Sequence, residues 1–525
     1  MFIDGRELPD GETLSTDVCI IGGGPAGIVL ALELAGSGRE VMLLEAGDIY
    51  YEDETQDLMS GPVLGHPYTP LDEARLRFFG GSSNHWSGNC LLYTEVDFEK
   101  RDWMPYSGWP ITLSDLMPYY DRALPYYELP TEKSFDFDHW ATTLGGRVLD
   151  VDERFLKNTA MMTSPPTIFG YTYEERLNAA EGVTVYLNCN VTELDTTDDG
   201  NTVTEAKVTV MNGPKLTVRA RRFVVSAGGI ETPRLLMNST RVKPNGIGND
   251  NDLVGRFFNE HPSIRPVIRT LVPKGDEPLT LYHDYTPLES TGGFWACLTS
   301  SEEFLRREEV GGFVFNLFRD DRSPGDLAIR RLTGALKTGE APPYLSSEIG
   351  NLLSDLDGAT NAIAGDVLGR DDRLIDHEWL GPWISWECVP NPDSRVVLLD
   401  EVDEIGMKKI GLDWQFHELD MRTLKRSVEV LTAELSRLGV GRSWTDVLRD
   451  DYEIPMTVGQ GKHHACTTRM SEDASTGVVD ADCRVHGMSN LYINGCATFA
   501  TGGYTFPTFT IGAMAIRLAD HLKAN

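Results

Sequence analysis

Positive charge is scarce in this chain of 525 residues. It has 47 lysine and arginine residues against 80 aspartate and glutamate residues, which gives a formal net charge of −33. Nucleic-acid backbones and anionic membrane surfaces would repel a protein with this charge, so the sequence predicts neither kind of partner. The apolar fraction of 41% allows a sizeable core, and the length suggests two or more domains.

Paired cysteines and long apolar runs are also missing. The eight cysteines are irregularly spaced without a CxxC pair, a pattern typical of neither a disulfide framework nor a zinc site. We therefore expect no metal and a reducing, cytoplasmic setting. The first twelve residues have no basic or apolar region of the kind found in a secretory signal. The longest apolar stretch, 18–35, is interrupted by four glycines, a proline and a glutamate, so it predicts no membrane span.

The N-terminal part of the chain predicts a strand–turn–helix–strand unit. Residues 17–21 form a short, mostly apolar run that is typical of a buried parallel strand. Residues 26–35 are apolar on most sides and predict a buried helix, which Gly36 ends. Residues 40–45 predict a second buried strand, and the whole unit is typical of the start of a doubly wound sheet.

The turn of this unit carries a nucleotide-binding motif. Gly22, Gly24 and Gly27 form the pattern G-x-G-x-x-G. The first glycine allows a tight turn, the second lets a pyrophosphate approach the helix N-terminus, and the third lets the helix pack on the strand. Glu45 ends the second strand, where its carboxylate can accept a hydrogen bond from a ribose hydroxyl. The motif predicts a dinucleotide site and leaves open whether FAD or NAD occupies it.

The remaining pattern predicts an α/β protein that is α+β overall. Residues 180–227 have strand character, and 263–320 together with 378–415 predict a second, antiparallel sheet. Residues 324–375 are polar and helical, and 510–522 predict a closing helix.

Five sequence blocks together resemble the glucose–methanol–choline (GMC) family of FAD-dependent oxidoreductases. They follow the family's order along nearly the whole chain, at 22–47, 78–88, 223–236, 254–262 and 462–499. The likeness is greatest to the bacterial branch of sugar and glycoside oxidases and dehydrogenases. The resemblance implies a Rossmann-like FAD-binding domain and a substrate domain whose mainly antiparallel sheet covers the flavin. It divides the chain into FAD-binding segments 1–100, 175–262 and 455–525 and substrate segments 101–174 and 263–454, with the catalytic histidine in the last FAD-binding segment.

The resemblance also implies a set of residues that contact FAD, from the adenine end to the flavin ring. The family positions that contact the ADP half correspond here to Gly22, Gly24, Pro25, Ala26, Gly27, Glu45 and Ala46. Val191 corresponds to the position at the adenine, and Ala227 and Gly228 correspond to positions near the phosphates. The ribityl chain and flavin match Asn494, Gly495, Gly80, Gly81, Ser82, Asn84, Trp86, Ser87, Phe506, Pro507 and Thr508.

His85 lies in an S-x-x-H-W pattern with Ser82 and Trp86. In some members of the family such a histidine carries a covalent bond to the flavin 8α-methyl group. In others FAD is held without a covalent bond and the histidine only packs on the ring. The sequence leaves both alternatives open.

His463 matches the histidine of the family pattern H-x-x-G-T-x-R-M, which faces the reactive edge of the flavin. Alcohol oxidation needs a base within hydrogen-bond reach of the hydroxyl, and histidine suits this because its ordinary pKa lies near neutral pH. We expect His463 to act as this base or to stabilise the alkoxide. His464 is the neighbouring alternative.

Two positions depart from the family pattern. Cys466 replaces a glycine, and we expect it to be a small packed side chain rather than a nucleophile. Phe506 replaces the second catalytic residue, normally His or Asn, and its side chain can neither donate nor accept a hydrogen bond. Thr505 or Tyr504 could supply the missing group if the loop is shifted. Other motif residues have structural interpretations: His261 precedes Pro262 in the block at 254–262, and Glu387 matches a strand over the substrate.

The sequence thus predicts an FAD-dependent oxidoreductase that acts on CH–OH groups of a sugar, glycoside or polyol. Electrons then pass to O2 or to an external acceptor. Two alternatives stay open: the same fold with altered chemistry, such as desaturation or a lyase reaction, and a non-catalytic binding protein stabilised by flavin. An oligomer is possible, and the exact substrate is not predicted.

Overall fold

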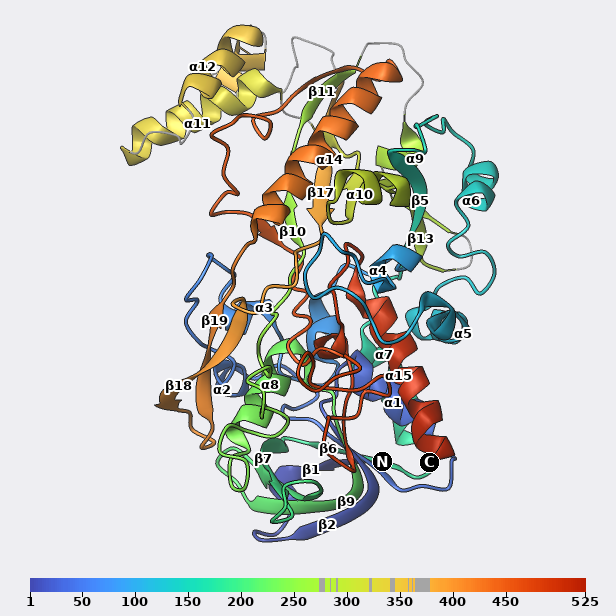
Figure 1. The fold of residues 1–525 in the computed structure, drawn as a ribbon, viewed down its shortest axis with the longest axis vertical. Coiled ribbons are helices and arrows are strands. Elements are labelled where there is room, and N and C mark those ends of the chain that lie inside the picture. The colour runs from blue at the N-terminus through green and yellow to red at the C-terminus, as the bar shows by residue number, and fades with distance from the viewer. Residues whose placement is uncertain are drawn as a thin grey trace.

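Two large sheets lie towards opposite ends of the long axis of the molecule (Figure 1). The structure is a computed structural model that describes residues 1–272, 279–283, 285–288, 291–320, 323–339, 345–356, 358–360, 362–363 and 378–525. The chain passes repeatedly between the two sheets, so each is assembled from segments far apart in the sequence.

The first sheet is mainly parallel, as predicted. Its parallel strands lie in the order β1 (Phe2–Asp4), β6 (Val183–Leu187), β3 (Val41–Leu44), β2 (Thr13–Ile21) and β9 (Lys215–Val225), and β22 (Leu491–Ile493) also pairs with β9. β8 (Val203–Thr209) and β7 (Asn190–Thr196) extend it in antiparallel fashion.

The predicted strand–turn–helix–strand unit is present, with small shifts at its ends. The first strand begins at Thr13, four residues before the predicted start, and the helix α1 covers Pro25–Leu34. Residues Val18–Ile21 and Val41–Leu44 are all buried, which explains their continuous apolar sequence. The helix α1 packs against α7 (Phe169–Asn178) and against the C-terminal helix α15 (Pro507–Ala524). The prediction of a Rossmann-like α/β fold is confirmed.

The second sheet is antiparallel throughout its described strands. Their order is β21 (Gly459–Gln460), β10 (Pro262–Ile264), β17 (Trp383–Trp386), β14 (Phe313–Asn316), β13 (Gly293–Ser300), β5 (Leu156–Thr163) and β4 (Asn89–Cys90), with β12 (Thr286–Pro287) beside β13. β4 and β21 come from segments that the sequence assigns to FAD binding, but they pair with β5 and β10 of this second sheet. The five segment boundaries stay a prediction.

The sequence predicts one antiparallel sheet from 263–320 and 378–415, but the described strands of these ranges are divided among three sheets. A small separate sheet contains β15 (Arg319–Asp320), β16 (Glu378–Leu380), β11 (Arg269–Val272) and β20 (Arg442–Trp444). β18 (Arg395–Val402) pairs only with β19 (Lys408–Asp413) among the described strands, and this hairpin lies beside helix α8 (Gly228–Asn238). A short turn joins these two strands, so they satisfy each other's backbone hydrogen bonds locally.

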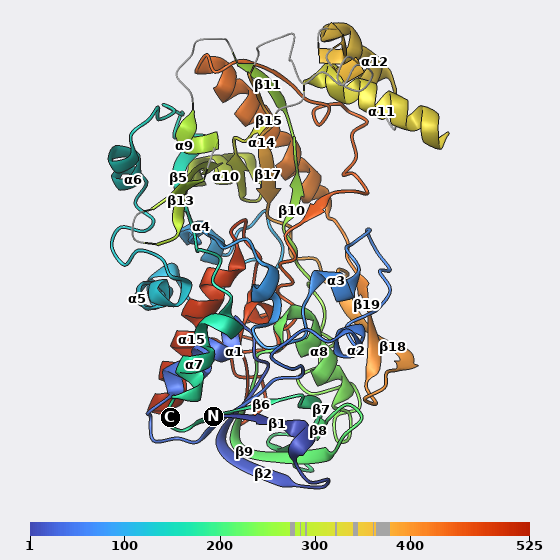
Figure 2. The ribbon, with the colours of Figure 1, turned by 180° about the vertical axis from the view of Figure 1, so that it is seen from behind.

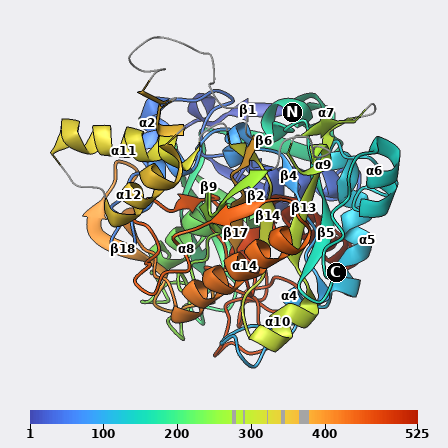
Figure 3. The ribbon, with the colours of Figure 1, turned by 90° about the horizontal axis from the view of Figure 1, so that it is seen from above.

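Further helices cover the two sheets. The long helix α14 (Glu418–Arg437) runs along the second sheet (Figure 2), and α11 (Pro324–Thr338) with α12 (Leu345–Ser354) projects from that end of the molecule (Figure 3). These two helices agree with the predicted helical segment 324–375, whose last part, 364–375, lies outside the described residues. The shorter helices are α2 (Asp53–Asp57), α3 (Leu71–Ala74), α4 (Glu95–Phe98), α5 (Leu113–Ala123), α6 (Phe137–Leu144), α9 (Thr280–His283) and α10 (Glu302–Glu308). Within the described part of the chain, no helix has the length and apolar character needed to cross a bilayer.

Candidate active site

A cavity of about 470 Å3 opens where β2 and β3 end and α1 begins. This volume is typical of a site for a cofactor or small molecule. Most of the residues predicted from the sequence line it: Gly22, Gly24, Pro25, Ala26, Glu45, Ala46, Gly81, Ser82, His85, Trp86, Ser87, Val191, Ala227, Gly228, His463, His464, Asn494, Gly495, Phe506, Pro507 and Thr508. The predicted residues Gly27, Gly80, Asn84 and Thr505 do not line it.

The glycine turn leaves room for a phosphate group at the start of α1. Gly22 has φ +112°, and a Cβ there would lie 2.6 Å from the carbonyl oxygen of Ser226. A Cβ on Gly24 would meet no atom within 4 Å, so this glycine faces open space in the cavity wall. Gly27 serves packing instead, because its Cβ would lie 2.0 Å from the oxygen of Gly22. The helix N-terminus therefore fits the pyrophosphate of a dinucleotide such as FAD.

Glu45 stands at the wall of the cavity with its carboxylate held in place. Its two oxygens accept one hydrogen bond each, from the backbone N–H of Gly23 at 2.8 Å and of Gly47 at 2.9 Å. A carboxylate has about four acceptor positions, so it can still accept hydrogen bonds from ribose hydroxyls. At the other side of α1, Asn494 donates from Nδ2 to the oxygen of Ala26 at 2.9 Å and ties the end of β22 to the helix.

The loop that contains His85 is shaped by two residues that do not line the cavity. Gly80 has φ +96°, and a Cβ there would lie 2.8 Å from the backbone nitrogen of Gly170. Asn84 donates from Nδ2 to the oxygens of Phe79 at 3.1 Å and Gly81 at 2.9 Å. The loop is thereby folded into a short 3-10 turn whose outer side chains, including His85, lie along the cavity.

His463 and His464 both reach the cavity but differ in their partners. The Nδ1 atom of His463 lies 2.7 Å from Nδ1 of His261, and the rings of His463 and Phe506 pack in a T-shaped arrangement with centroids 5.7 Å apart. The Nε2 atom of His464 lies 2.9 Å from the hydroxyl of Tyr68. Burial lowers the pKa of both imidazoles well below the ordinary value, so both are neutral at pH 7. Neutral imidazole is the form that a general base requires.

Glu260 is a buried carboxylate that is hydrogen-bonded to the backbone of His261 and His463. Its carboxylate accepts hydrogen bonds from the backbone N–H of His261 at 2.7 Å and of His463 at 3.0 Å, and from the hydroxyl of Tyr68. Burial raises the pKa of Glu260 to about 7. The sequence alone gives the block at 254–262 a structural interpretation and does not predict Tyr68 as a site residue. The signal available in the block at 254–262 was the adjacent acid and histidine, Glu260 and His261.

Three residues close in sequence to this group have a left-handed backbone conformation. Phe257, Lys462 and Cys466 have φ values of +61°, +59° and +68°, a region that side chains other than glycine rarely adopt. The conformation at Cys466 explains why a glycine matches this position in the family pattern. Burial raises the pKa of the Cys466 thiol, and the side chain is fully buried, as expected for a packed rather than a nucleophilic cysteine.

Phe506 lies in the cavity wall beside His463 and stacks on Trp383, with ring centroids 6.2 Å apart. Thr505 and Tyr504 are buried and do not line the cavity; Tyr504 packs under the second sheet. The loop shift that would bring either residue to the site is therefore not present. At Phe506 the cavity wall is therefore apolar, where the family pattern has a hydrogen-bonding side chain.

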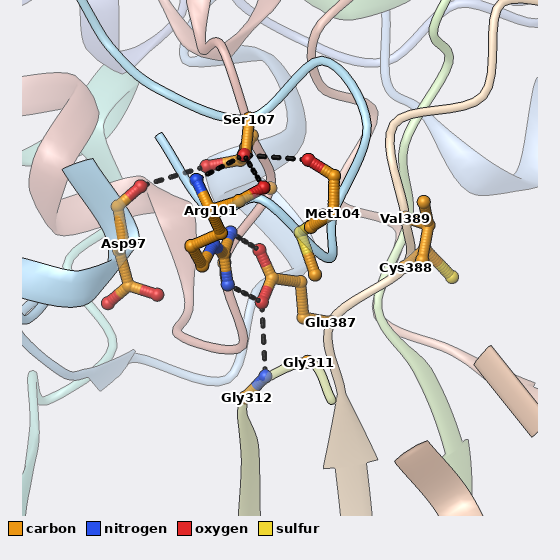
Figure 4. Close-up of polar contacts among 12 residues, drawn as sticks. Asp97, Arg101, Met104, Ser107, Gly311, Gly312, Glu387, Cys388 and Val389 are labelled. Carbon is orange, nitrogen blue, oxygen red and sulfur yellow. Dashed lines mark hydrogen bonds and ion pairs between the residues drawn. The ribbon is translucent and has the colours of Figure 1, made fainter. Parts of the chain in front are cut away.

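Glu387 lies behind the site, at the end of β17, rather than in the cavity wall. It forms a fully buried ion pair with Arg101, at 2.8 and 2.6 Å, and accepts a hydrogen bond from the backbone of Gly312 at 3.0 Å (Figure 4). Asp97 lies beside the pair, and burial together with the charge of Glu387 raises its pKa to about 6. The ion pair attaches the segment after α4 to the second sheet.

Two family models match this chain, in the two regions that build the cavity. One, described as FAD dependent oxidoreductase, matches residues 17–247, and the other, described as GMC oxidoreductase, matches residues 390–515. These matches confirm the resemblance of this chain to the GMC family of FAD-dependent oxidoreductases. The predictions of an enzyme and of FAD as its cofactor are confirmed.

Curated relatives match over almost the full length. The chain is 24% identical to 2-methyl-1,2-propanediol dehydrogenase of Mycolicibacterium austroafricanum, covering 97% of this chain and 95% of the relative. It is 22% identical to the fructose dehydrogenase large subunit of Gluconobacter japonicus (97% and 98%) and 24% identical to 6'''-hydroxyparomomycin C oxidase of Streptomyces lividus (97% and 92%). Among solved structures, a formate oxidase has the same fold, with a TM-score of 0.54, 17% identity and coverage of 98% and 99%.

Proposed function

We propose that this enzyme oxidises a CH–OH group of a sugar, glycoside or polyol. The observation that carries the proposal is the neutral imidazole of His463 in the wall of the cavity, next to the segments that match the family's FAD site. The relatives support the substrate class, since their names include a diol dehydrogenase, a fructose dehydrogenase and an oxidase of 6'''-hydroxyparomomycin C.

The residues that would hold FAD are those of the glycine turn, Glu45, Val191, the loop at 80–87 and the segment at 494–495. When bound, FAD supplies the acceptor for the hydride that leaves the carbinol carbon. The part of this chain is to remove the hydroxyl proton. His463 can do so from Nε2, because its Nδ1 is already engaged with His261 and no hydrogen bond to its Nε2 is found among the described residues.

Phe506, which stacks on Trp383, forms the cavity wall beside His463 and bears on which alcohol is used. With no second hydrogen-bonding side chain there, a small hydrophilic sugar would be held at its hydroxyl mainly by His463. We infer a substrate whose own apolar part packs on Phe506, such as an aryl glycoside. Phe506 also favours a second candidate, in which the same cofactor serves altered chemistry such as desaturation or a lyase reaction.

The acceptor of the electrons is O2 or an external compound, and an oligomer is compatible with this function. We propose a cytoplasmic location because all eight cysteines are free and buried.

The test is anaerobic mixing of the purified enzyme with a panel of sugars, glycosides and simple alcohols while the flavin absorbance is recorded. We expect bleaching by at least one glycoside or sugar, with a carbonyl product. His463→Ala should slow bleaching by about 10²–10⁴-fold and keep its FAD, as expected for the loss of a general base. His464→Ala is the matched control. Slow bleaching in His464→Ala with full activity in His463→Ala would overturn the assignment, and an unsaturated or eliminated product would favour the second candidate.

A further inference from the structure

His261 is buried behind His463 and does not line the cavity. Its Nε2 atom lies between two backbone carbonyl oxygens, 3.0 Å from that of Gly502 and 2.9 Å from that of Gly503. Its Nδ1 atom lies 2.7 Å from Nδ1 of His463. Each nitrogen of the His261 ring therefore has an identified hydrogen-bond partner.

The partners decide which nitrogen of His261 carries the proton. Carbonyl oxygens only accept, so Nε2 of His261 must be the N–H that donates to Gly502 and Gly503. Burial lowers the pKa of His261, so the ring is neutral and its Nδ1 bears a lone pair. The short contact between the two Nδ1 atoms then requires that His463 is the donor.

A neutral His463 with its proton on Nδ1 has a free lone pair on Nε2. That nitrogen lies on the edge of the ring opposite to the buried His261, and the His463 side chain is partly exposed in the cavity wall. The opposite tautomer would place an N–H towards the substrate and could not accept a proton.

We propose that His261 is a positioning residue that sets the tautomer of His463, so that Nε2 faces the substrate hydroxyl as an acceptor. The bridge by Glu260 supports this role, because one carboxylate accepts from the backbone N–H of both histidines and keeps the two rings in register. The reactive imidazole is thus held at Nδ1 by His261 and at its backbone by Glu260. This inference rests on the proposed role of His463 as a base.

Two variants of His261 separate the tautomer from simple packing. His261→Phe keeps a ring of similar size but has no acceptor for the Nδ1 proton of His463. His261→Asn loses ring volume but keeps an oxygen acceptor close to the position of Nδ1. If His261 only filled space, the asparagine variant would be the more damaged of the two.

We expect the turnover number of His261→Phe to fall at least about 10-fold, since loss of the group that orients a catalytic imidazole costs up to about 10⁴ in rate in comparable sites. KM and FAD content should change little, because His261 does not line the cavity. His261→Asn should recover a large part of the lost rate. Equal rates in wild type and His261→Phe, or a lower rate in His261→Asn than in His261→Phe, would overturn the proposal.

A second measurement does not depend on turnover. Nitrogen NMR of the holoenzyme labelled with ¹⁵N-histidine, with His463 assigned from the His463→Gln spectrum, reports which ring nitrogen is protonated. We expect Nδ1–H in the wild type and a shift towards Nε2–H in His261→Phe. An Nε2–H or doubly protonated His463 in the wild type would overturn the tautomer assignment. The expected tautomer without bleaching by any alcohol would support it and refute the proposed function.

Discussion

Replacing Arg101 by methionine should destabilise the protein more than any conservative change at its partner Glu387. The two side chains are fully buried and joined by hydrogen bonds of 2.8 and 2.6 Å. Asp97 adds a second carboxylate next to the same guanidinium (Figure 4). Arg101→Met therefore leaves two buried carboxylates without a cation, and breaking a buried ion pair in this way costs about 3–5 kcal/mol.

Glu387→Gln removes a charge but leaves Arg101 beside Asp97. The glutamine can still accept a hydrogen bond from Arg101 or Gly312, so we expect a smaller cost of about 1–3 kcal/mol, that of an imperfectly satisfied buried group. The double variant should lose less free energy of unfolding than the two single variants lose together. The reason is that it has neither the Arg101 cation nor the Glu387 carboxylate, so neither charge of the pair is left without its partner.

The assay is urea denaturation of the holoprotein followed by tryptophan fluorescence, with the midpoint and slope compared among the wild type, both single variants and the double variant. FAD content at low urea serves as the control for correct folding, since neither side chain lines the cavity. A cost below about 1 kcal/mol for Arg101→Met, or a larger cost for Glu387→Gln, would refute the reasoning from the buried charges.

Four further predictions concern separate groups. Phe506→Asn should raise the rate on free glucose relative to aryl glycosides, and an unchanged ratio would place Phe506 outside the substrate site. If His85 is bonded to FAD, acid precipitation leaves the yellow colour in the pellet and a His85 peptide gains the flavin mass, whereas colour in the supernatant shows a non-covalent cofactor. Burial raises the pKa of Asp420 to about 7 from its ordinary 3.8, so the carboxyl is protonated in the folded state at low pH and its ionisation opposes folding as pH rises. In the wild type, the contribution of Asp420 to the free energy of unfolding should therefore fall by about 4 kcal/mol between about pH 4 and pH 8, and Asp420→Asn should not show this fall. Equal pH dependence of the urea midpoints of the two proteins would contradict this. Cys466→Gly should stay within about 1 kcal/mol of the wild type, because relief of the left-handed backbone offsets the lost contacts, whereas the β-branched Cys466→Val should be clearly less stable in the same assay.

Much of the fold could be predicted because its signals are local. The strands predicted at 17–21 and 40–45 contain the continuous apolar runs 18–21 and 41–44, and the helix between them is apolar on most sides. Each element lies within a few residues of the predicted position. The antiparallel sheet was also predictable as a class, but its division was not. Whether β18 joins the large sheet or pairs only with its neighbour depends on which surface covers it.

Some residues of the candidate site could be predicted from the sequence, and others could not. Residues of the glycine turn could be found from their spacing, because a dinucleotide demands particular residue types there, and the histidines at 463 and 464 could be found from the family pattern that they resemble. The partners of these residues could not be found. His261 lies 202 positions from His463, and Arg101 lies 286 positions from Glu387.

The amino-acid sequence by itself determined a dinucleotide site, since the glycine motif has local backbone requirements, and its resemblance to the GMC family indicated the class of the protein, FAD and the position of the candidate base. Only the tertiary structure decided that His261 faces His463, that Glu260 holds both, and that Phe506 rather than Thr505 reaches the cavity. The reason is physical: a hydrogen bond between distant segments depends on how sheets and helices pack, and packing is set by the whole buried surface at once.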